Sequence, residues 1–225
     1  MSESPMYHSR LNCARMVLCA MLMLCAANNG FAHGTKVHTE RGKGDSVGSI
    51  EAGSKASAVD LRDTELVDQD GHTMKFASKV LGDKLVALTF IYTSCTTICP
   101  VTSAIFTQLQ QRLGARMDSE VRLVSVTLDP VVDTPARLKA YSAKHGRKPG
   151  WIWLTGEKSK VDHVLDGLGA YAAEFNQHAS MVLVGDPISG QWIRLFGFPS
   201  PDDIIARLDR FKAKRARVSM ASTKD

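Results

Sequence analysis

The positions of apolar residues divide the chain into a leading apolar run, a polar stretch and a longer region of recurring apolar clusters. Residues 16–27 are apolar throughout, and residues 33–57 contain almost no large apolar side chain. From there apolar segments alternate with glycine-containing polar segments, a pattern typical of one folded domain. We expect a flexible linker over residues 33–57, the domain over residues 58–213 and a basic disordered tail over residues 214–225.

Within the domain, strand-like and helix-like patterns alternate. Residues 85–92 (LVALTFIY) form a continuous apolar, β-rich run, whose length suits a strand buried on both faces. Residues 65–76 predict a hairpin that turns at Asp70 and Gly71. The other predicted strands are 121–128, 151–154, 181–184 and 191–196, and the predicted helices are 104–113, 135–144, 159–175 and 201–214.

This order of elements predicts an α/β fold of the thioredoxin-like class. After an N-terminal β-hairpin come two strand–helix units, a third strand with its helix, a second hairpin and a closing helix. Parallel units followed by an antiparallel hairpin give a central mixed sheet flanked by helices. In open α/β sheets the functional site lies at the carboxyl ends of the strands, which directs attention to the residues after the strand at 85–92.

The N-terminal residues have the features of an export signal. Arg10 and Arg15 precede the apolar run at 16–27, and Gly30 and Ala32 provide small residues for a signal peptidase. A membrane-spanning helix needs about 20 apolar residues, so the run is short for a permanent anchor. We therefore expect residues 1–32 to be a cleaved signal peptide and the protein to be periplasmic. Anchoring to the inner membrane by an uncleaved signal is the alternative.

The charge of the chain is mildly basic, with a formal net charge of +5 at pH 7. Its densest basic stretch, residues 210–217, has the composition of a solvated helix end and tail, and association with a membrane surface is the alternative. No nucleic-acid-binding motif accompanies it, so we expect no nucleic-acid partner. We expect a monomer.

Cysteine usage concentrates the thiol chemistry in one motif. Three of the five cysteines lie within residues 1–32, so a processed protein retains only Cys95 and Cys99. Pro100 follows the second cysteine, which suggests that Cys99 caps a helix, and a helix N-terminus lowers the pKa of a thiol. Two sulfurs are too few for structural zinc, whereas two thiolates with one imidazole suit copper, particularly Cu(I).

Two features of this motif leave alternatives open. A plain disulfide between Cys95 and Cys99 would close so short a loop that it would contribute little to stability. His178 precedes the predicted strand 181–184, and a thioredoxin-like layout brings that loop near the cysteines. An ordinary loop histidine is the alternative interpretation of His178.

Three motifs together resemble the Sco (SenC/PrrC-like) family. They are TSCTTICP at residues 93–100, DPVVDTP at residues 129–135 and the later His178, and the resemblance extends over residues 60–212. It implies a copper chaperone that binds Cu(I) or Cu(II) through Cys95, Cys99 and His178. It also implies a role in assembling the dinuclear copper centre of cytochrome c oxidase subunit II, or of another copper-site protein. Asp133 matches a family aspartate near the metal, although its sequence context favours a helix start.

A second hypothesis is a thiol–disulfide oxidoreductase that reduces cysteines of an exported copper protein. It uses Cys95 and Cys99 as a redox pair and does not need His178. A peroxidase or redox sensor is a third hypothesis, which the absence of a further thiol in the processed chain disfavours. A purely structural disulfide in a binding module is the fourth.

Overall fold

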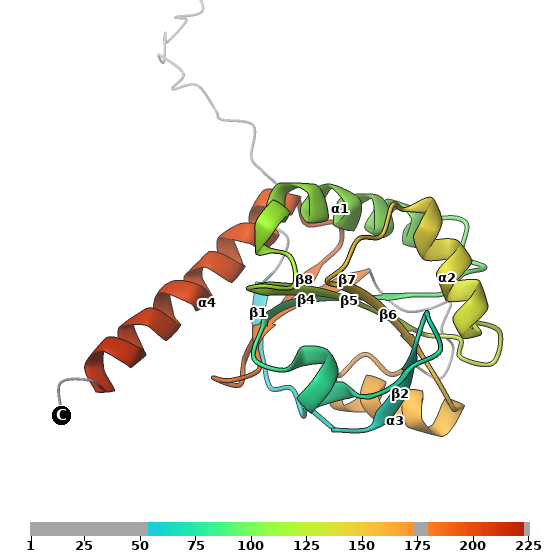
Figure 1. The fold of residues 1–225 in the computed structure, drawn as a ribbon, viewed down its shortest axis with the longest axis horizontal. Helices are drawn as coiled ribbons and strands as arrows, with labels where there is room; N and C mark the ends of the chain where they lie inside the picture. The colour runs from blue at the N-terminus through green and yellow to red at the C-terminus, as the bar shows by residue number, and fades with distance from the viewer. Residues whose placement is uncertain (1–53, 173–179, 223–225) are drawn as a thin grey trace, which may run out of the picture. The chain divides into compact units, whose positions relative to one another are not determined.

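An eight-stranded mixed sheet runs through the computed structural model, which describes residues 54–172 and 180–222 (Figure 1). The strands follow the order β1-β8-β7-β4-β5-β6-β2-β3 across the sheet. They are β1 (Ser54–Ser57), β2 (Glu65–Asp68), β3 (Thr73–Lys75), β4 (Leu85–Ile91), β5 (Val121–Thr127), β6 (Trp151–Thr155), β7 (Met181–Asp186) and β8 (Gln191–Phe196). The helices are α1 (Ile98–Leu113), α2 (Pro135–Lys144), α3 (Lys158–Gly167) and α4 (Pro201–Ser222), with a π-helical turn η1 (Phe76–Leu81) and a 3₁₀ turn η2 (Gly114–Arg116).

The centre of the sheet is parallel and its flanks are antiparallel. β4, β5 and β6 run parallel, with Leu85 paired to Val121 and Ile91 paired to Thr127, whereas β7 runs antiparallel to β4. All seven residues of β4 are buried, because helices cover both faces of the sheet. The predicted thioredoxin-like α/β class and both predicted hairpins are therefore confirmed.

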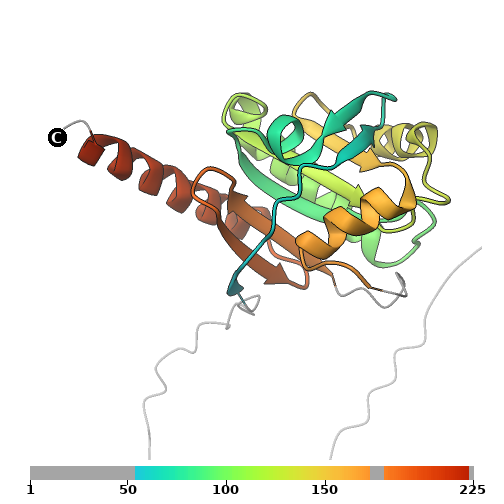
Figure 2. The ribbon, with the colours of Figure 1, turned by 90° about the horizontal axis from the view of Figure 1, so that it is seen from below.

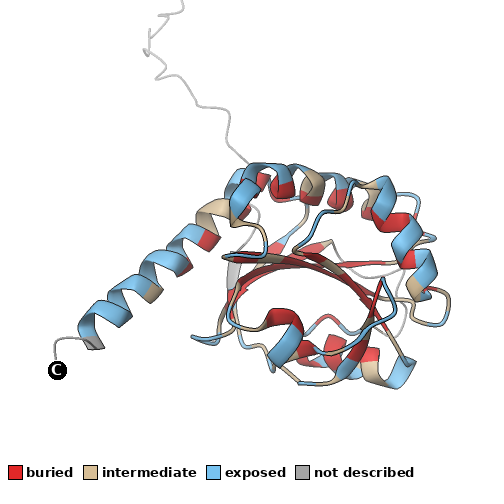
Figure 3. Ribbon diagram, viewed as in Figure 1, coloured by how far each residue is buried: buried red, intermediate tan, exposed pale blue. Residues whose placement is uncertain are grey.

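Two hydrophobic cores lie on opposite faces of the sheet. α1, α2 and α4 cover one face, and α3 with η1 covers the other (Figures 1 and 3). Successive side chains of β4 alternate between them: Ala87 and Ile91 belong to the first core, and Leu88 and Phe90 to the second. Both cores lie within a single compact unit, Val47–Asp225.

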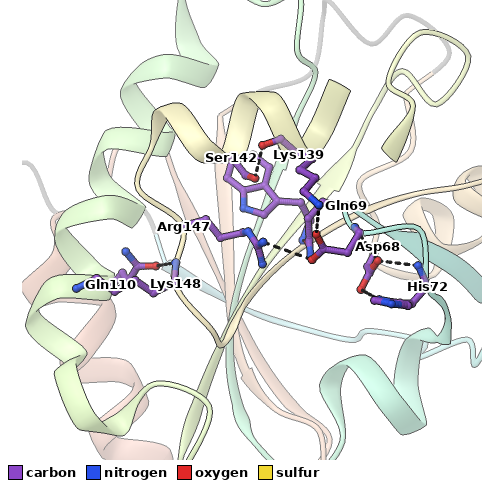
Figure 4. A network of polar contacts seen from close by, with 10 residues as sticks. Asp68, Gln69, His72, Gln110, Lys139, Ser142, Arg147 and Lys148 are labelled. Carbon is purple, nitrogen blue, oxygen red and sulfur yellow. Dashed lines mark hydrogen bonds and ion pairs between the residues drawn. The ribbon is translucent and has the colours of Figure 1, made fainter. Parts of the chain in front are cut away.

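Polar contacts attach the first hairpin to the rest of the fold (Figure 4). The Asp70 carboxylate, at the tip of the β2–β3 hairpin, pairs with Lys139 at 3.1 Å and with Arg147 at 3.3 Å. The adjacent Gln69 accepts a hydrogen bond from the backbone N–H of Trp153 at 2.8 Å. These contacts fix the hairpin beside α2 and β6, at the side of the sheet away from β1.

Element ends differ from the sequence-based expectation by more than two residues in four places. The helix predicted to begin at residue 104 begins at Ile98. The helix predicted over residues 159–175 ends at Gly167, because Gly169 takes a φ of 62° and the Ala170 N–H bonds to Leu165 O, as in a Schellman cap. Residues 54–57, expected in the linker, form β1 by pairing with β8. Residues 214–222, expected to be a disordered tail, continue α4 to Ser222.

The last correction has a specific cause. Arg215 lies past the predicted helix end and bonds to the Asp186 carboxylate and to Asp83 O at 2.7 Å. These contacts hold the helix against the ends of β7 and β4. Figure 2 shows the remainder of α4 extending past the edge of the sheet. No helix among residues 54–172 and 180–222 is both long and apolar enough to cross a membrane. The expected signal peptide at 1–32 lies outside the described residues.

Candidate metal centre

The two cysteines lie at the junction between β4, the first central strand, and α1, the first long helix. Cys95 occupies the loop between β4 and α1, and Cys99 is the second residue of α1. Thr97, rather than Cys99, is the residue that precedes the helix, so the expectation that Cys99 is the N-cap is wrong. Both thiols are free, and each cysteine is only 6% exposed.

The sulfur of Cys95 receives hydrogen bonds from the start of α1. The backbone N–H of Cys99 points at Cys95 Sγ over 3.4 Å, and the Thr97 hydroxyl lies 3.9 Å from the same sulfur. Cys95 is itself held by its own N–H, which donates to Tyr92 O at 3.1 Å. The first turn of a helix carries unpaired N–H groups that favour a negative charge, so this arrangement stabilises a Cys95 thiolate.

The two thiols consequently have very different acidities. Burial alone raises the pKa of Cys95, but hydrogen bonds from the Cys99 thiol, from the N–H groups of Cys99 and Thr97, and from Tyr92 outweigh it and lower the pKa to about 6. Burial and the bond to Cys95 raise the pKa of Cys99 to about 12. The Tyr92 hydroxyl, bonded to Cys95, has its pKa raised to about 12. At neutral pH Cys95 is therefore a thiolate and Cys99 a thiol, and the Cys99 thiol donates a hydrogen bond to the Cys95 thiolate.

A fully buried carboxylate anchors the loop that carries Cys95. Asp133 accepts hydrogen bonds from the Thr93 N–H at 3.1 Å, from the Thr93 hydroxyl at 2.5 Å and from the Thr127 hydroxyl at 2.6 Å. The predicted helix start is also present, since Thr134 caps α2 by accepting from Arg137 N–H at 3.3 Å. The pattern-based interpretation thus found the helix start and missed the anchoring role of Asp133.

Aromatic side chains form the wall behind the cysteines. The Tyr141 hydroxyl lies 3.5 Å from Ser103 Oγ on α1, and its ring packs on Trp153 with centroids 5.5 Å apart. Burial raises the pKa of Tyr141, and this effect outweighs the hydrogen bond with Ser103, which lowers it. Such an apolar wall excludes water and strengthens electrostatic interactions between the sulfurs and anything bound to them.

The third expected ligand, His178, lies outside the described residues. Within the described ranges no group of three or more His, Cys, Asp or Glu side chains is arranged to hold a metal ion. The histidines in these ranges have other partners: His72 contacts Asp68 at 3.2 Å, His163 contacts Arg62 at 3.0 Å, and His145 packs on Tyr141. The structure therefore brings Cys95 and Cys99 together, while His178 stays a prediction.

Fold and site together define a thioredoxin-like protein with a nearly buried pair of free thiols, four residues apart, at the start of a helix. The family described as SCO1/SenC matches residues 55–212, so the chain belongs to the SCO1/SenC family. A Stutzerimonas stutzeri protein named for copper binding is 34% identical over 105 residues, 47% of this chain and 50% of its own length. A SCO1 protein homolog from Bacillus subtilis is 37% identical over 90 residues, covering 40% of this chain and 45% of the relative. The chain thus spans about half the length of these curated relatives.

Solved structures give the same fold. BsSco, a member of the Sco family of cytochrome c oxidase assembly proteins in which a disulfide switch was identified, superposes with a TM-score of 0.59 and 27% identity. That superposition covers 69% of this chain and 95% of BsSco. Copper-bound ScoI of Bradyrhizobium japonicum superposes with a TM-score of 0.54 over 65% of this chain and 96% of its own, at 22% identity, and shows the fold alone.

Proposed function

We propose that this chain is a copper-binding metallochaperone whose ligands are Cys95, Cys99 and His178. Its cargo would go to the dinuclear copper centre of cytochrome c oxidase subunit II, or to another copper-site protein. The observation that carries the proposal is the pair of free, nearly buried sulfurs at the start of α1, where the backbone N–H of Cys99 donates to Cys95 Sγ. Membership of a family whose members include BsSco, an oxidase assembly protein, supports the choice of partner.

The residues present fit a soft metal ion as cargo. Thiolates are the ligands that Cu(I) prefers, and Cys95 is already a thiolate at neutral pH because its pKa is about 6. Cys99 would release its proton on binding, so uptake of the ion would release about one proton near pH 7. Asp133 holds Thr93, two residues before Cys95, and so keeps the loop in place during loading and release.

The position of β7 supports His178 as the third ligand. Val182 pairs with Thr89, so β7 begins at the end of β4 that leads into the cysteine loop. Ser180, the first described residue before β7, bonds to Gly197 O at 2.8 Å and fixes the entry to the strand. His178 lies two residues earlier in the chain, and an imidazole is a common copper ligand.

A second candidate, thiol–disulfide exchange, is favoured by the unequal acidities of the two thiols. The Cys95 thiolate would attack one sulfur of a disulfide in an exported copper protein and displace the other sulfur as a thiolate. Cys99 would then lose its proton and attack Cys95 Sγ, leaving a Cys95–Cys99 disulfide and two reduced thiols in the substrate. The two electrons come from the cysteine pair, which a further dithiol reductant would have to restore.

We further propose that the protein acts as a monomer in the periplasm, exported by residues 1–32. A solved SCO1/SenC relative from Bacillus anthracis, 26% identical with a TM-score of 0.58, is described as a lipoprotein, which supports an extracytoplasmic location. Whether the apolar run at 16–27 is removed or retained as an anchor is decided by mass spectrometry of the exported chain.

Copper titration of the reduced protein tests the proposal and separates the two candidates. The wild type is compared with His178→Ala and with a matched control, His72→Ala, because His72 has a side chain that is 74% exposed on a hairpin turn. We expect one copper per chain with thiolate-to-copper charge transfer in the wild type and control. Losing even a partner of a ligand weakens binding about 10–100-fold, so His178→Ala should bind at least about tenfold more weakly.

Two results would contradict this assignment. Equal copper affinity in all three proteins would remove His178 from the ligand set. Failure of the wild type to retain copper, together with rapid exchange of Cys95 and Cys99 with a model disulfide, would establish the reductase instead.

A further inference from the structure

The last helix, α4, has an unequal distribution of charge along its length. Its acidic residues, Asp202, Asp203 and Asp209, all belong to the first half. From residue 210 to residue 222 the helix has five basic residues and no acidic one. The basic residues are Arg210, Lys212, Lys214, Arg215 and Arg217.

Two of these five cations are used within the fold. Lys212 pairs with Glu120 at 2.5 Å, and Arg215 pairs with Asp186 at 2.5 Å. The other three are exposed, and no ion pair joins them to any acidic residue of the described ranges. They are Arg210, Lys214 and Arg217.

These three cations form one face of the helix. At about 100° per residue, Arg210, Lys214 and Arg217 fall within an arc of about 60°. Together with Ala213 and Val218 they line one surface hollow; we call these five residues the basic face. The buried side of the helix is different and consists of Ile204, Leu208 and Phe211. Figure 3 shows the far half of α4 mostly exposed, whereas its first half includes buried residues.

Such a stripe is unfavourable for an isolated helix. Like charges at positions i and i+4, as at Arg210 and Lys214, repel one another. The helix dipole favours cations only within the last turn, and Arg210 lies about three turns before Ser222. The projecting part of α4 thus carries a row of cations that repel one another. Contact with an anionic surface would offset this repulsion.

We propose that the basic face docks on an anionic lipid bilayer. Val218 and Met220, each 63% exposed, flank the cations on either side. Cations combined with exposed apolar side chains are typical of helices that lie on membranes, and anionic lipids attract basic segments close to the surface. An acidic protein would satisfy the cations alone and would give no role to Val218 and Met220. The apolar run at 16–27, an export signal or anchor, is consistent with a protein that works beside a membrane.

Docking in this way would orient the cysteine pair. Arg215 contacts Asp83 O, two residues before β4, whereas Cys95 follows the opposite end of β4. The six residue steps from Leu85 to Ile91 span about 20 Å. The cysteines would therefore face away from the bilayer, towards a partner domain that projects from it. This orientation rests on the proposed function, but the lipid binding does not.

Vesicle flotation tests the proposal with residues 33–225, which contain the whole compact unit Val47–Asp225. The vesicles are phosphatidylcholine alone or phosphatidylcholine with 30% phosphatidylglycerol. We expect binding only to the anionic vesicles and its loss at high salt. Replacing Arg210, Lys214 and Arg217 together by Gln, which keeps helix propensity, should weaken binding about fivefold per charge and about a hundredfold in total.

A matched variant removes three exposed cations elsewhere, Lys79, Arg137 and Lys144, each replaced by Gln. It should bind like the wild type, and circular dichroism should show equal helix content in all three proteins. Equal losses in both triple variants would overturn the proposal, because net charge alone would then explain binding. Absence of binding to anionic vesicles would also overturn it and would leave an acidic protein as the partner of the basic face. Copper is not needed in this assay, so its outcome is independent of the metal site.

Discussion

Replacing Asp133 by Ala should destabilise the fold and loosen the cysteine loop together. The Asp133 carboxylate is fully buried, and it accepts hydrogen bonds from the N–H and hydroxyl of Thr93 and from the hydroxyl of Thr127. Ala removes all three acceptor contacts and leaves the donors without partners. Thr127 is fully buried, so water cannot replace its lost partner without a structural change.

The size of the effect follows from these three contacts. A hydrogen bond to a charged group contributes about 1.5–3 kcal/mol, and an unsatisfied buried donor costs about 1–3 kcal/mol. Thr93 is half-buried and regains hydration, and removing a buried charge offsets part of the loss. We expect a net loss of about 3 kcal/mol in the free energy of unfolding. For a domain of this size that corresponds to a fall in Tm of about 6–12 °C.

Urea unfolding followed by tryptophan fluorescence measures this loss, since Trp151 and Trp153 are fully buried. Asp129→Ala is the matched control, because Asp129 precedes the same helix and bonds through its backbone. We expect a change below about 0.5 kcal/mol for the control. Copper retention by Asp133→Ala should fall below that of the control. If Asp133→Ala unfolded at the same urea concentration as Asp129→Ala, the anchoring role of Asp133 would be refuted.

Three further predictions follow from the described contacts. Alkylation of Cys95 by iodoacetamide should rise with pH to a midpoint near the thiol pKa of about 6, and a midpoint near 8.5 would contradict the hydrogen bonds at its sulfur. Gly185→Ala should lower stability by about 2 kcal/mol or more in urea unfolding, because an added Cβ would lie 2.2 Å from the Trp192 ring. Arg215→Gln should destabilise the fold near pH 7 by leaving the Asp186 carboxylate without its ion pair. Burial raises the pKa of Asp186, but the hydrogen bond from Arg215 outweighs burial, so the pKa is lowered. The stability that the Asp186 carboxylate contributes should therefore be lost in the wild type as the pH falls below about 4. The stability of the variant should change less over the same pH range.

The central elements could be predicted because their cause is local. A continuous apolar run rich in β-branched and aromatic residues favours a strand covered on both faces, and β4 is such a strand. The first residues of α2 likewise contain their own cap, Thr134, and Pro135 at the first helical position. In these segments the residues that determine the structure lie within the segment itself.

Two of the wrongly predicted element ends depend on distant residues, whereas the early end of α3 has a local cause at Gly169. β1 has a polar sequence without a strand pattern and exists because its backbone pairs with β8, more than 130 residues later. The last turns of α4 are preceded by Arg215, which bonds to Asp186 at the end of β7, 29 residues earlier in the chain. Since these contacts join residues far apart in the sequence, a window of neighbouring residues does not contain them.

The metal centre shows the same division between local and distant causes. Cys95 and Cys99 were identified because both sulfurs belong to one short segment, whereas the partners of Asp133 lie elsewhere in the chain. A signal for its anchoring role was nevertheless present. Thr93 follows β4 and Thr127 ends β5, and these two strands are parallel neighbours with Ile91 beside Thr127. Hydroxyl groups at the carboxyl ends of adjacent parallel strands meet at one edge of the sheet, so an acid in the loop after β5 has two donors within reach. A predicted strand order would therefore have been sufficient to assign Asp133 to the support of the cysteine loop.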